Sequence, residues 1–227
     1  GRKLSTSQNW AVWLLDYLKR YDPDPLRYLL SINMPETSDT DFSWREFVRR
    51  NNDELVATYG NLVHRVLTFV YRNFDASVPD PGQLDAQDKE ILSGTEKTLR
   101  TVDELLYGCH FREAIRTIMA LAQEANRYLD DKSPWKAIKE NRQDAAKSLY
   151  VALQVIANLK TMLYPFLPFS SRKLHEYLGF TGSIEDSGWK WQELPPGQKL
   201  LPPQPLFSKL DDSLVEEETK KLGQTPS

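Results

Sequence analysis

The sequence is poor in the residues that build metal centres and covalent cross-links. Its 227 residues include one cysteine, Cys109, and three histidines, His64, His110 and His175, which lie far apart. A single cysteine excludes a disulfide framework within the chain and a cysteine-based zinc site. We therefore expect no metal ion here, a buried Cys109 that packs as a small hydrophobic residue, and a reducing, cytoplasmic compartment.

Long apolar runs and a strong excess of one charge are also missing. We expect no signal peptide, and no uninterrupted apolar run reaches the ~18 residues of a membrane span. The nearest candidate, residues 150–169, is interrupted by Gln154, Asn158 and Lys160, which predicts a core helix instead. The net charge of −3 at pH 7 gives no general sign of nucleic-acid binding, so such binding requires a local basic face. We expect neither a membrane nor DNA as a partner.

Strand-like alternation is absent from the sequence, and helical spacing dominates. Apolar residues recur at steps of three and four along most of the chain, and Pro165 and Pro168 end one such segment. Ser43 and Glu46 predict the start of the longest helix, and Gly179 predicts the end of a short one. The fold class is therefore all-α, a bundle of about five helices with short connections. The predicted helices of the bundle span residues 43–74, 85–107, 111–129, 144–163 and 170–180.

Composition divides the chain into three parts. Residues 1–45 form a turn-rich segment with short helical patterns, one of which has Leu15 and Leu18 at helical spacing. Residues 46–180 hold the helical bundle. Residues 181–227 begin with a stretch rich in proline and tryptophan, which predicts an irregular strap that packs back on the bundle.

A tryptophan stands where two predicted helices meet, in the segment YLDDKSPWK. Ser133 is a suitable N-cap and Pro134 a suitable first residue for the second helix, which puts Trp135 in its first turn. An aromatic plane next to cations and free backbone N–H groups can stack a nucleobase while its phosphate is neutralised. The alternative is that Trp135 staples two helices together, since most tryptophans are largely buried. The cations near Trp135 in the sequence are Lys132, Lys136 and Lys139.

The longest predicted helix offers a second candidate site. Asn61 and Arg65 lie one turn apart on the face opposite its apolar stripe. Asparagine supplies a hydrogen-bond donor and an acceptor, and arginine supplies a planar fork, so together they can reach the edge of an unstacked base. The alternative is an ordinary solvated helix face. Thr58, Thr68 and Arg72 share this face.

Four stretches of the sequence together resemble one enzyme family. GRKLSTSQNWAV, at residues 1–12, resembles the KMSKS signature loop of class I aminoacyl-tRNA synthetases. PETSDTDFSW, at residues 35–44, resembles the segment after this loop in methionyl-tRNA synthetases. REAIRTIMALAQEANRYLDDKSPWK, at residues 112–136, resembles the anticodon-binding bundle of the same family, and PLFSKLDDSLVEE, at residues 205–217, resembles its C-terminal strap.

The resemblance implies a helical anticodon-binding bundle preceded by a small stem-contact segment. It implies that Asn61, Arg65, Pro134 and Trp135 read the CAU anticodon, with the Trp135 ring stacked on an unstacked base. The implied partner is methionine tRNA, bound through its anticodon stem-loop. The parent enzyme of this family attaches methionine to that tRNA and uses ATP to do so.

The resemblance also implies ATP-binding residues in the signature loop: Lys3, Ser5, Thr6 and Ser7. In the family, this mobile lysine-bearing loop stabilises the triphosphate of ATP as methionyl-adenylate forms. Thr6 stands where the family usually has its second lysine, and a threonine donates a hydrogen bond but supplies no charge. We expect the family's catalytic nucleotide-binding domain to precede residue 1 as a missing partner, and this chain alone to catalyse nothing.

Two other interpretations remain open from the sequence. The chain is compatible with a freestanding, non-catalytic tRNA-binding module, and also with a structural helical bundle that has protein partners only. A reading frame that extends upstream of Gly1 favours the enzyme fragment. An acidic surface around Trp135, or no tRNA binding at low salt, favours the structural bundle.

Overall fold

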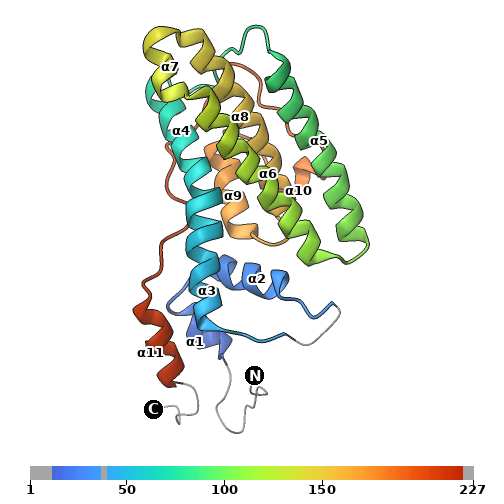
Figure 1. The fold of residues 1–227 in the computed structure, drawn as a ribbon, viewed down its shortest axis with the longest axis vertical. Helices are drawn as coiled ribbons and strands as arrows, with labels where there is room; N and C mark the ends of the chain where they lie inside the picture. The colour runs from blue at the N-terminus through green and yellow to red at the C-terminus, as the bar shows by residue number, and fades with distance from the viewer. Residues whose placement is uncertain (1–11, 37–39, 222–227) are drawn as a thin grey trace.

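The protein is a bundle of helices with a smaller helical group at one end (Figure 1). The computed structural model describes residues 12–36 and 40–221. Within these ranges all regular structure is helical, apart from one isolated antiparallel bridge between Ser77 and Lys199. The predicted all-α class is confirmed. The helices are α1 (Leu14–Leu18), α2 (Pro23–Ile32), α3 (Trp44–Arg50), η1 (Asn51–Gly60), α4 (Asn61–Asn73), α5 (Ala86–Tyr107), α6 (Phe111–Lys132), α7 (Pro134–Glu140), α8 (Arg142–Leu163), α9 (Pro168–Tyr177), α10 (Ile184–Ser187) and α11 (Ser213–Lys221).

The helix α8 forms the centre of the bundle and contacts α4, α5, α6, α7 and α9. Its residues 151–163 are all buried, including the polar residues that interrupt the apolar run. Gln154 donates to the carbonyl of Leu194 (2.7 Å), and Asn158 donates to the carbonyl of Gln192 (3.1 Å). The polar side chains of this core helix therefore hold the backbone of the strap, which satisfies both partners without water. Among the described residues no helix has the length and apolar character of a membrane span.

The long helix predicted for residues 43–74 is not a single α-helix. It begins as α3, where the hydroxyl of Ser43 accepts from the backbone N–H of Glu46, and then becomes the π-helix η1 before it resumes as α4. An alanine methyl at Gly60 would lie 2.7 Å from the carbonyl oxygen of Leu55, so the last π turn depends on a residue without a side chain. The wider turn also presents Asn52 to the strap, where its amide exchanges two hydrogen bonds with the backbone of Leu210 (both 2.9 Å).

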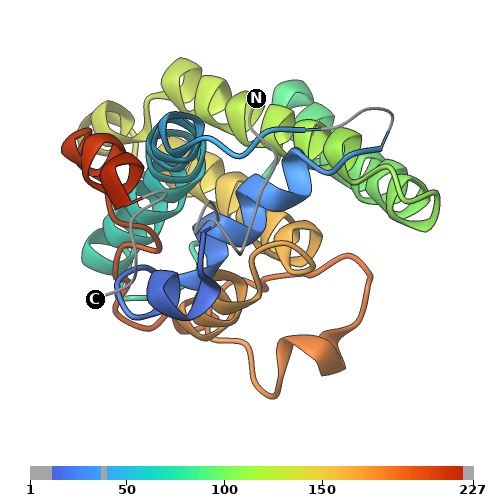
Figure 2. The same cartoon turned by 90° about the horizontal axis from the view of Figure 1, so that it is seen from below.

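A second, smaller hydrophobic cluster lies below the bundle (Figures 1 and 2). It joins Tyr17 of α1, Leu29 of α2, and Trp44 and Phe47 of α3 to Leu214 of α11. These four helices lie together at the lower end of the molecule in Figure 1. The spacing of Leu15 and Leu18 predicted a short helix, which α1 confirms, but these two side chains are 77% and 45% exposed, and Tyr17 is the residue that α1 buries. α11 packs on α3 and so brings the end of the described chain back to its beginning.

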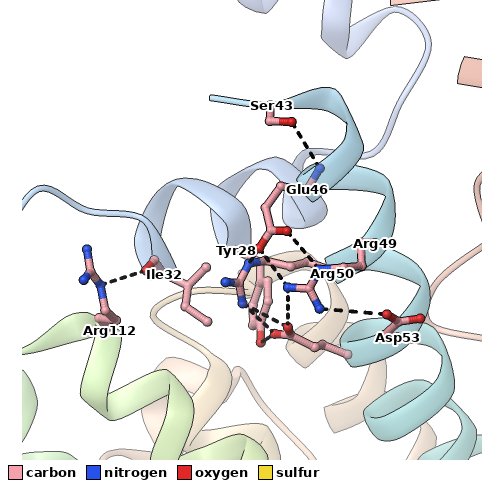
Figure 3. Close-up of polar contacts among 9 residues, drawn as sticks. Tyr28, Ile32, Ser43, Glu46, Arg49, Arg50, Asp53 and Arg112 are labelled. Atoms are coloured by element: carbon pink, nitrogen blue, oxygen red, sulfur yellow. Dashed lines mark hydrogen bonds and ion pairs between the residues drawn. The ribbon is translucent and has the colours of Figure 1, made fainter. Parts of the chain in front are cut away.

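Polar contacts fix the N-terminal segment against the bundle (Figure 3). Arg112, at the start of α6, donates to the carbonyls of Ile32 (3.2 Å) and Met34 (2.9 Å) at the end of α2. The hydroxyl of Tyr28 donates to Glu54 of η1 (2.5 Å). Asp24 of α2 is buried and accepts from both the backbone N–H and the hydroxyl of Ser170 at the first turn of α9 (2.6 Å each). The carboxylate of one helix therefore caps another that is distant in sequence.

Cys109 does not lie where the sequence predicted. It is exposed in the turn between α5 and α6, with φ of 57°. A buried position would require Cys109 to lie on an apolar helix face, but it falls after the last residue of α5. Its backbone N–H and that of His110 donate to the carbonyls of Leu106 and Leu105, which ends α5 at Tyr107, where the predicted helix also ended.

Candidate nucleic-acid interface

Asn61, Arg65 and Trp135 come from two different helices and lie on one side of the bundle. Asn61 and Arg65 share a face of α4, one turn apart, as the spacing predicted. The guanidinium carbon of Arg65 lies over the ring of Trp135, 4.4 Å from its centroid. Asn61 is exposed, whereas Arg65 and Trp135 are half-buried. The structure therefore brings the two candidate sites of the sequence together into one.

A sharp turn at Ser133 places Trp135 against α4. Ser133 adopts a left-handed backbone (φ 42°, ψ 55°) between α6 and α7. Ser133 is the N-cap residue of α7, as predicted, but its side chain makes no capping bond, because the hydroxyl donates back to the carbonyl of Asp130 (2.7 Å). Its backbone carbonyl instead accepts from Lys136 and Ala137 to begin α7 (2.9 and 3.0 Å). Pro134 is buried at the first position of α7, where its missing N–H is harmless.

Phe69 is the residue of this site that the sequence did not single out. It follows Arg65 by one turn on α4, and its ring meets that of Trp135 edge to face at 5.6 Å and 86°. The sequence placed Phe69 in the apolar stripe of the helix, and the four-residue step from Arg65 was the only sign of its second role. Trp135 also packs against the main core, so it does connect α7 to α4 while part of its ring stays exposed.

The three lysines near Trp135 differ in their surroundings. Lys132 is committed to α5: its ammonium lies 2.6 Å from Asp85 and 3.1 Å from the buried Asp88, which also accepts from Tyr128 (2.8 Å). The hydrogen bond from Lys132 lowers the pKa of Asp85 to about 2. Lys136 and Lys139 are exposed and form no ion pair with a carboxylate that the structure describes. These two, with the exposed Arg72, are the cations available to a ligand.

Other candidate chemistry is absent from the described part of the chain. No group of three or more histidine, cysteine or acidic side chains is placed to hold a metal ion within those residues. His175 packs inside the protein, as the sequence favoured, and its Nδ1 lies 3.0 Å from the ammonium of Lys160. The signature-loop residues Lys3, Ser5, Thr6 and Ser7 lie outside the described residues.

Comparison with protein families assigns both parts of the chain. Residues 1–67 match the family of class I tRNA synthetases (M), and residues 78–226 match the anticodon binding domain of methionyl tRNA ligase. The second match covers more than half of the chain and includes Trp135. The chain belongs to the anticodon-binding domain family of methionyl-tRNA ligase.

Individual relatives agree with this family. Methionine–tRNA ligase of Dehalococcoides mccartyi is 58% identical over 223 residues, which are 98% of this chain and 40% of the relative. Methionine–tRNA ligase of Chloroflexus aurantiacus is 46% identical over 248 residues, with 98% of this chain and 41% of the relative covered. The chain thus spans about two fifths of the length of these methionyl-tRNA ligases.

Solved structures of methionyl-tRNA synthetase share the fold. The free form of the Mycobacterium tuberculosis enzyme aligns with a TM-score of 0.81 and 26% identity over 88% of this chain and 41% of that one. A complex of the same enzyme with methionyl-adenylate aligns with a TM-score of 0.80 and 27% identity, over 86% of this chain and 39% of that one. The helical arrangement described above is therefore that of a methionyl-tRNA synthetase anticodon-binding region.

Proposed function

We propose that this chain binds the anticodon stem-loop of methionine tRNA and recognises its CAU anticodon. The observation that supports this most directly is the contact between Arg65 and Trp135. It joins Trp135, inside the matched anticodon-binding domain, to Arg65, at the end of the preceding match to class I tRNA synthetases (M). Asn61, one turn away and exposed, adds a donor and an acceptor at the same place.

Each side chain has a defined task in this proposal. The ring of Trp135, set by Pro134 before it, stacks on an unstacked base, and stacking of this kind contributes roughly 1–3 kcal/mol per base. Asn61 and Arg65 form hydrogen bonds with base edges, which gives the preference for one anticodon over another. Lys136, on the exposed side of α7, neutralises backbone phosphate without regard to sequence.

The complete protein, in the same proposal, is a cytoplasmic methionine–tRNA ligase that attaches methionine to its tRNA with ATP. Lys3, Ser5, Thr6 and Ser7 would contact ATP in its signature loop. The catalytic domain is the second partner of this chain, and the chain alone is inactive. The exposed Leu14 and Leu15 of α1 support such an intramolecular partner, because they form an uncovered apolar surface on the N-terminal segment.

The proposed domain division is 1–45 for the signature loop and stem-contact segment, 46–180 for the anticodon-binding bundle and 181–227 for the strap. Tyr17, Leu26 and Leu29 pack in a hydrophobic cluster apart from the main core, which supports a separate N-terminal unit, and Phe47 and Val48 of α3 belong to the same cluster. The hydrogen bonds from Gln154 and Asn158 to the carbonyls of Leu194 and Gln192 support a strap that packs on the bundle.

The first test compares two labelled RNA stem-loops, one with the CAU anticodon and one with that anticodon altered. We expect the CAU stem-loop to bind more tightly, and Trp135→Ala to weaken it by roughly 1–3 kcal/mol, as measured by fluorescence anisotropy. Tyr107→Ala is the matched control, because Tyr107 is a 95% exposed aromatic residue at the far end of α5. Equal affinity for both stem-loops, or none at low salt, would instead favour a structural bundle with protein partners.

The two lysines on either side of Trp135 should behave in opposite ways. Lys132→Met should lower the free energy of unfolding by about 1–3 kcal/mol, because it leaves the buried Asp88 short of a partner. Lys136→Met should leave the free energy of unfolding nearly unchanged and weaken the binding of both stem-loops alike. The slope of log binding constant against log salt concentration should fall by about 1, which corresponds to one phosphate contact. Urea denaturation and a salt titration of both variants measure this contrast. A stronger loss of RNA affinity in Lys132→Met than in Lys136→Met would contradict it.

A further inference from the structure

The face of Trp135 that a base would use is already covered by a side chain of the protein. The guanidinium carbon of Arg65 lies 4.4 Å from the centroid of the Trp135 ring, which is the geometry of a cation–π contact. Little other room is left around the ring. The Phe69 ring meets it edge to face, with 86° between the ring planes, and Trp135 also packs against the main core.

A base and the guanidinium exclude one another on this face. A stacked base lies in van der Waals contact with the ring, with carbon atoms roughly 3.5–4.0 Å apart. The Arg65 guanidinium fills that layer in the structure. A base therefore reaches this face of Trp135 only after Arg65 has left it.

Arg65 is free to leave, because no ion pair anchors its guanidinium to a carboxylate among residues 12–36 and 40–221. Arg20 shows the contrast: it holds the buried carboxylate of Glu218 in a two-pronged contact. A cation–π contact on a partly exposed ring is weak: it favours the covered over the uncovered ring by about two- to fivefold. The contact is strong enough to populate the covered state and weak enough for a base to displace it.

We propose that Arg65 and the incoming base exchange places on the Trp135 ring. The guanidinium covers the stacking face in the free protein, and the base displaces it. This rests on the proposed function and names how the same site is regulated. Once displaced, the guanidinium remains tethered to α4 beside Asn61, where it donates to the edge of the base that replaced it. Uncovering the ring costs every base the same free energy, and only a base that the freed guanidinium can bind recovers that cost. The covered state therefore keeps the binding of wrong anticodons weak.

The RNA test compares Arg65→Ala with Arg72→Ala. Arg72 is exposed on the same face of α4, so both variants lose one positive charge near the site and differ in the contact with Trp135. Exchange predicts that the stem-loop with the altered anticodon binds Arg65→Ala about two- to fivefold more tightly than Arg72→Ala. The CAU stem-loop should lose affinity in Arg65→Ala, because the reading contact is gone. Equal or weaker binding of the altered stem-loop by Arg65→Ala overturns the proposal.

A second measurement needs no RNA and separates this proposal from the proposed function. Acrylamide quenching of the Trp135 emission, taken as the difference between each protein and its Trp135→Phe counterpart, should increase in Arg65→Ala and not in Arg72→Ala. Unchanged quenching in Arg65→Ala would mean that the guanidinium does not cover the ring, whatever the RNA results. If the unmodified protein showed no preference for the CAU stem-loop, the proposed function would be wrong. The quenching result would still report whether Arg65 covers the ring.

Discussion

Gly179→Ala is expected to lower the free energy of unfolding by roughly 3 kcal/mol or more, through strain and a direct clash. Gly179 ends α9 with φ of +73°, and a methyl group there would lie 1.9 Å from the carbonyl oxygen of Lys199. The obstacle is backbone rather than a flexible side chain. The strap must therefore move away from α9 to admit the methyl group, and the hydrogen bond from Leu201 to the carbonyl of Tyr177 (2.9 Å) moves with it.

Gly197→Ala is the matched control for this effect. Gly197 also has positive φ, +84°, but a methyl group there meets no atom within 4 Å. It should show only the backbone strain, about 1 kcal/mol. Urea denaturation of the two variants isolates the clash as the difference between them. If Gly179→Ala were no less stable than Gly197→Ala, the close contact between Lys199 and the end of α9 would be wrong.

Acid is expected to destabilise the protein through a buried pair of basic side chains. His175 and Lys160 are both buried, with Nδ1 and Nζ 3.0 Å apart, and the Phe180 ring stacks on His175 and lies 4.1 Å from Nζ. Burial, and then the Lys160 ammonium, lower the pKa of His175 to about 4, while the backbone of Gly182, and then Glu185, act in the opposite direction. Burial lowers the pKa of Lys160 to about 8.

The direction of the pH effect follows from these values. Between pH 6.5 and about 4, His175 is protonated in the unfolded chain and neutral in the folded protein. The free energy of unfolding therefore falls as pH falls through this range. The gap between an ordinary histidine and a pKa of about 4 corresponds to roughly 3 kcal/mol. By the same reasoning, the Lys160 contribution makes stability rise as pH rises from about 8 towards 10.5.

Lys160→Met tests the origin of the acid effect. Without the neighbouring ammonium, the pKa of His175 should move up towards its ordinary value, and the loss of stability between pH 6.5 and 4 should shrink. Histidine NMR titration and urea denaturation at several pH values measure both. Lys173→Met is the control, because Lys173 is an exposed lysine on α9, two residues from His175. An equal shift of the His175 pKa in both variants would show that Lys160 has no special influence.

Local sequence signals predicted the helices and their ends well. Helix α5 begins with a capping box on Asp85, where the predicted helix began, and Gly179 ends α9 in the conformation that favours glycine. The spacing of Asn61 and Arg65 predicted a shared face because helical geometry fixes that relation locally. The roles of these residues in anticodon binding stay predictions.

Contacts between distant segments were beyond the sequence patterns. No sequence pattern indicated that Lys160 contacts His175, because a buried lysine is rare and its partner is on another helix. Ser133 is the N-cap of α7, but its left-handed backbone and the bond from its hydroxyl back to Asp130 were not predicted. The π-helix also depends on contacts from outside the helix, since Asn51 and Asn52 bond the strap. Tertiary packing decided these features over local propensity.

The contact between Arg20 and Glu218 has a consequence for how the protein is made. These two side chains are 198 residues apart in sequence, and Leu214 of the same helix completes the small N-terminal cluster. At a synthesis rate of about 5–20 residues per second, the N-terminal helices wait roughly 10–40 s on the ribosome for α11. During that interval the partly formed cluster leaves Tyr17, Trp44 and Phe47 without Leu214. The packing of α11 on α3 is therefore a late folding event, and until then the apolar side chains of this cluster are accessible to chaperones.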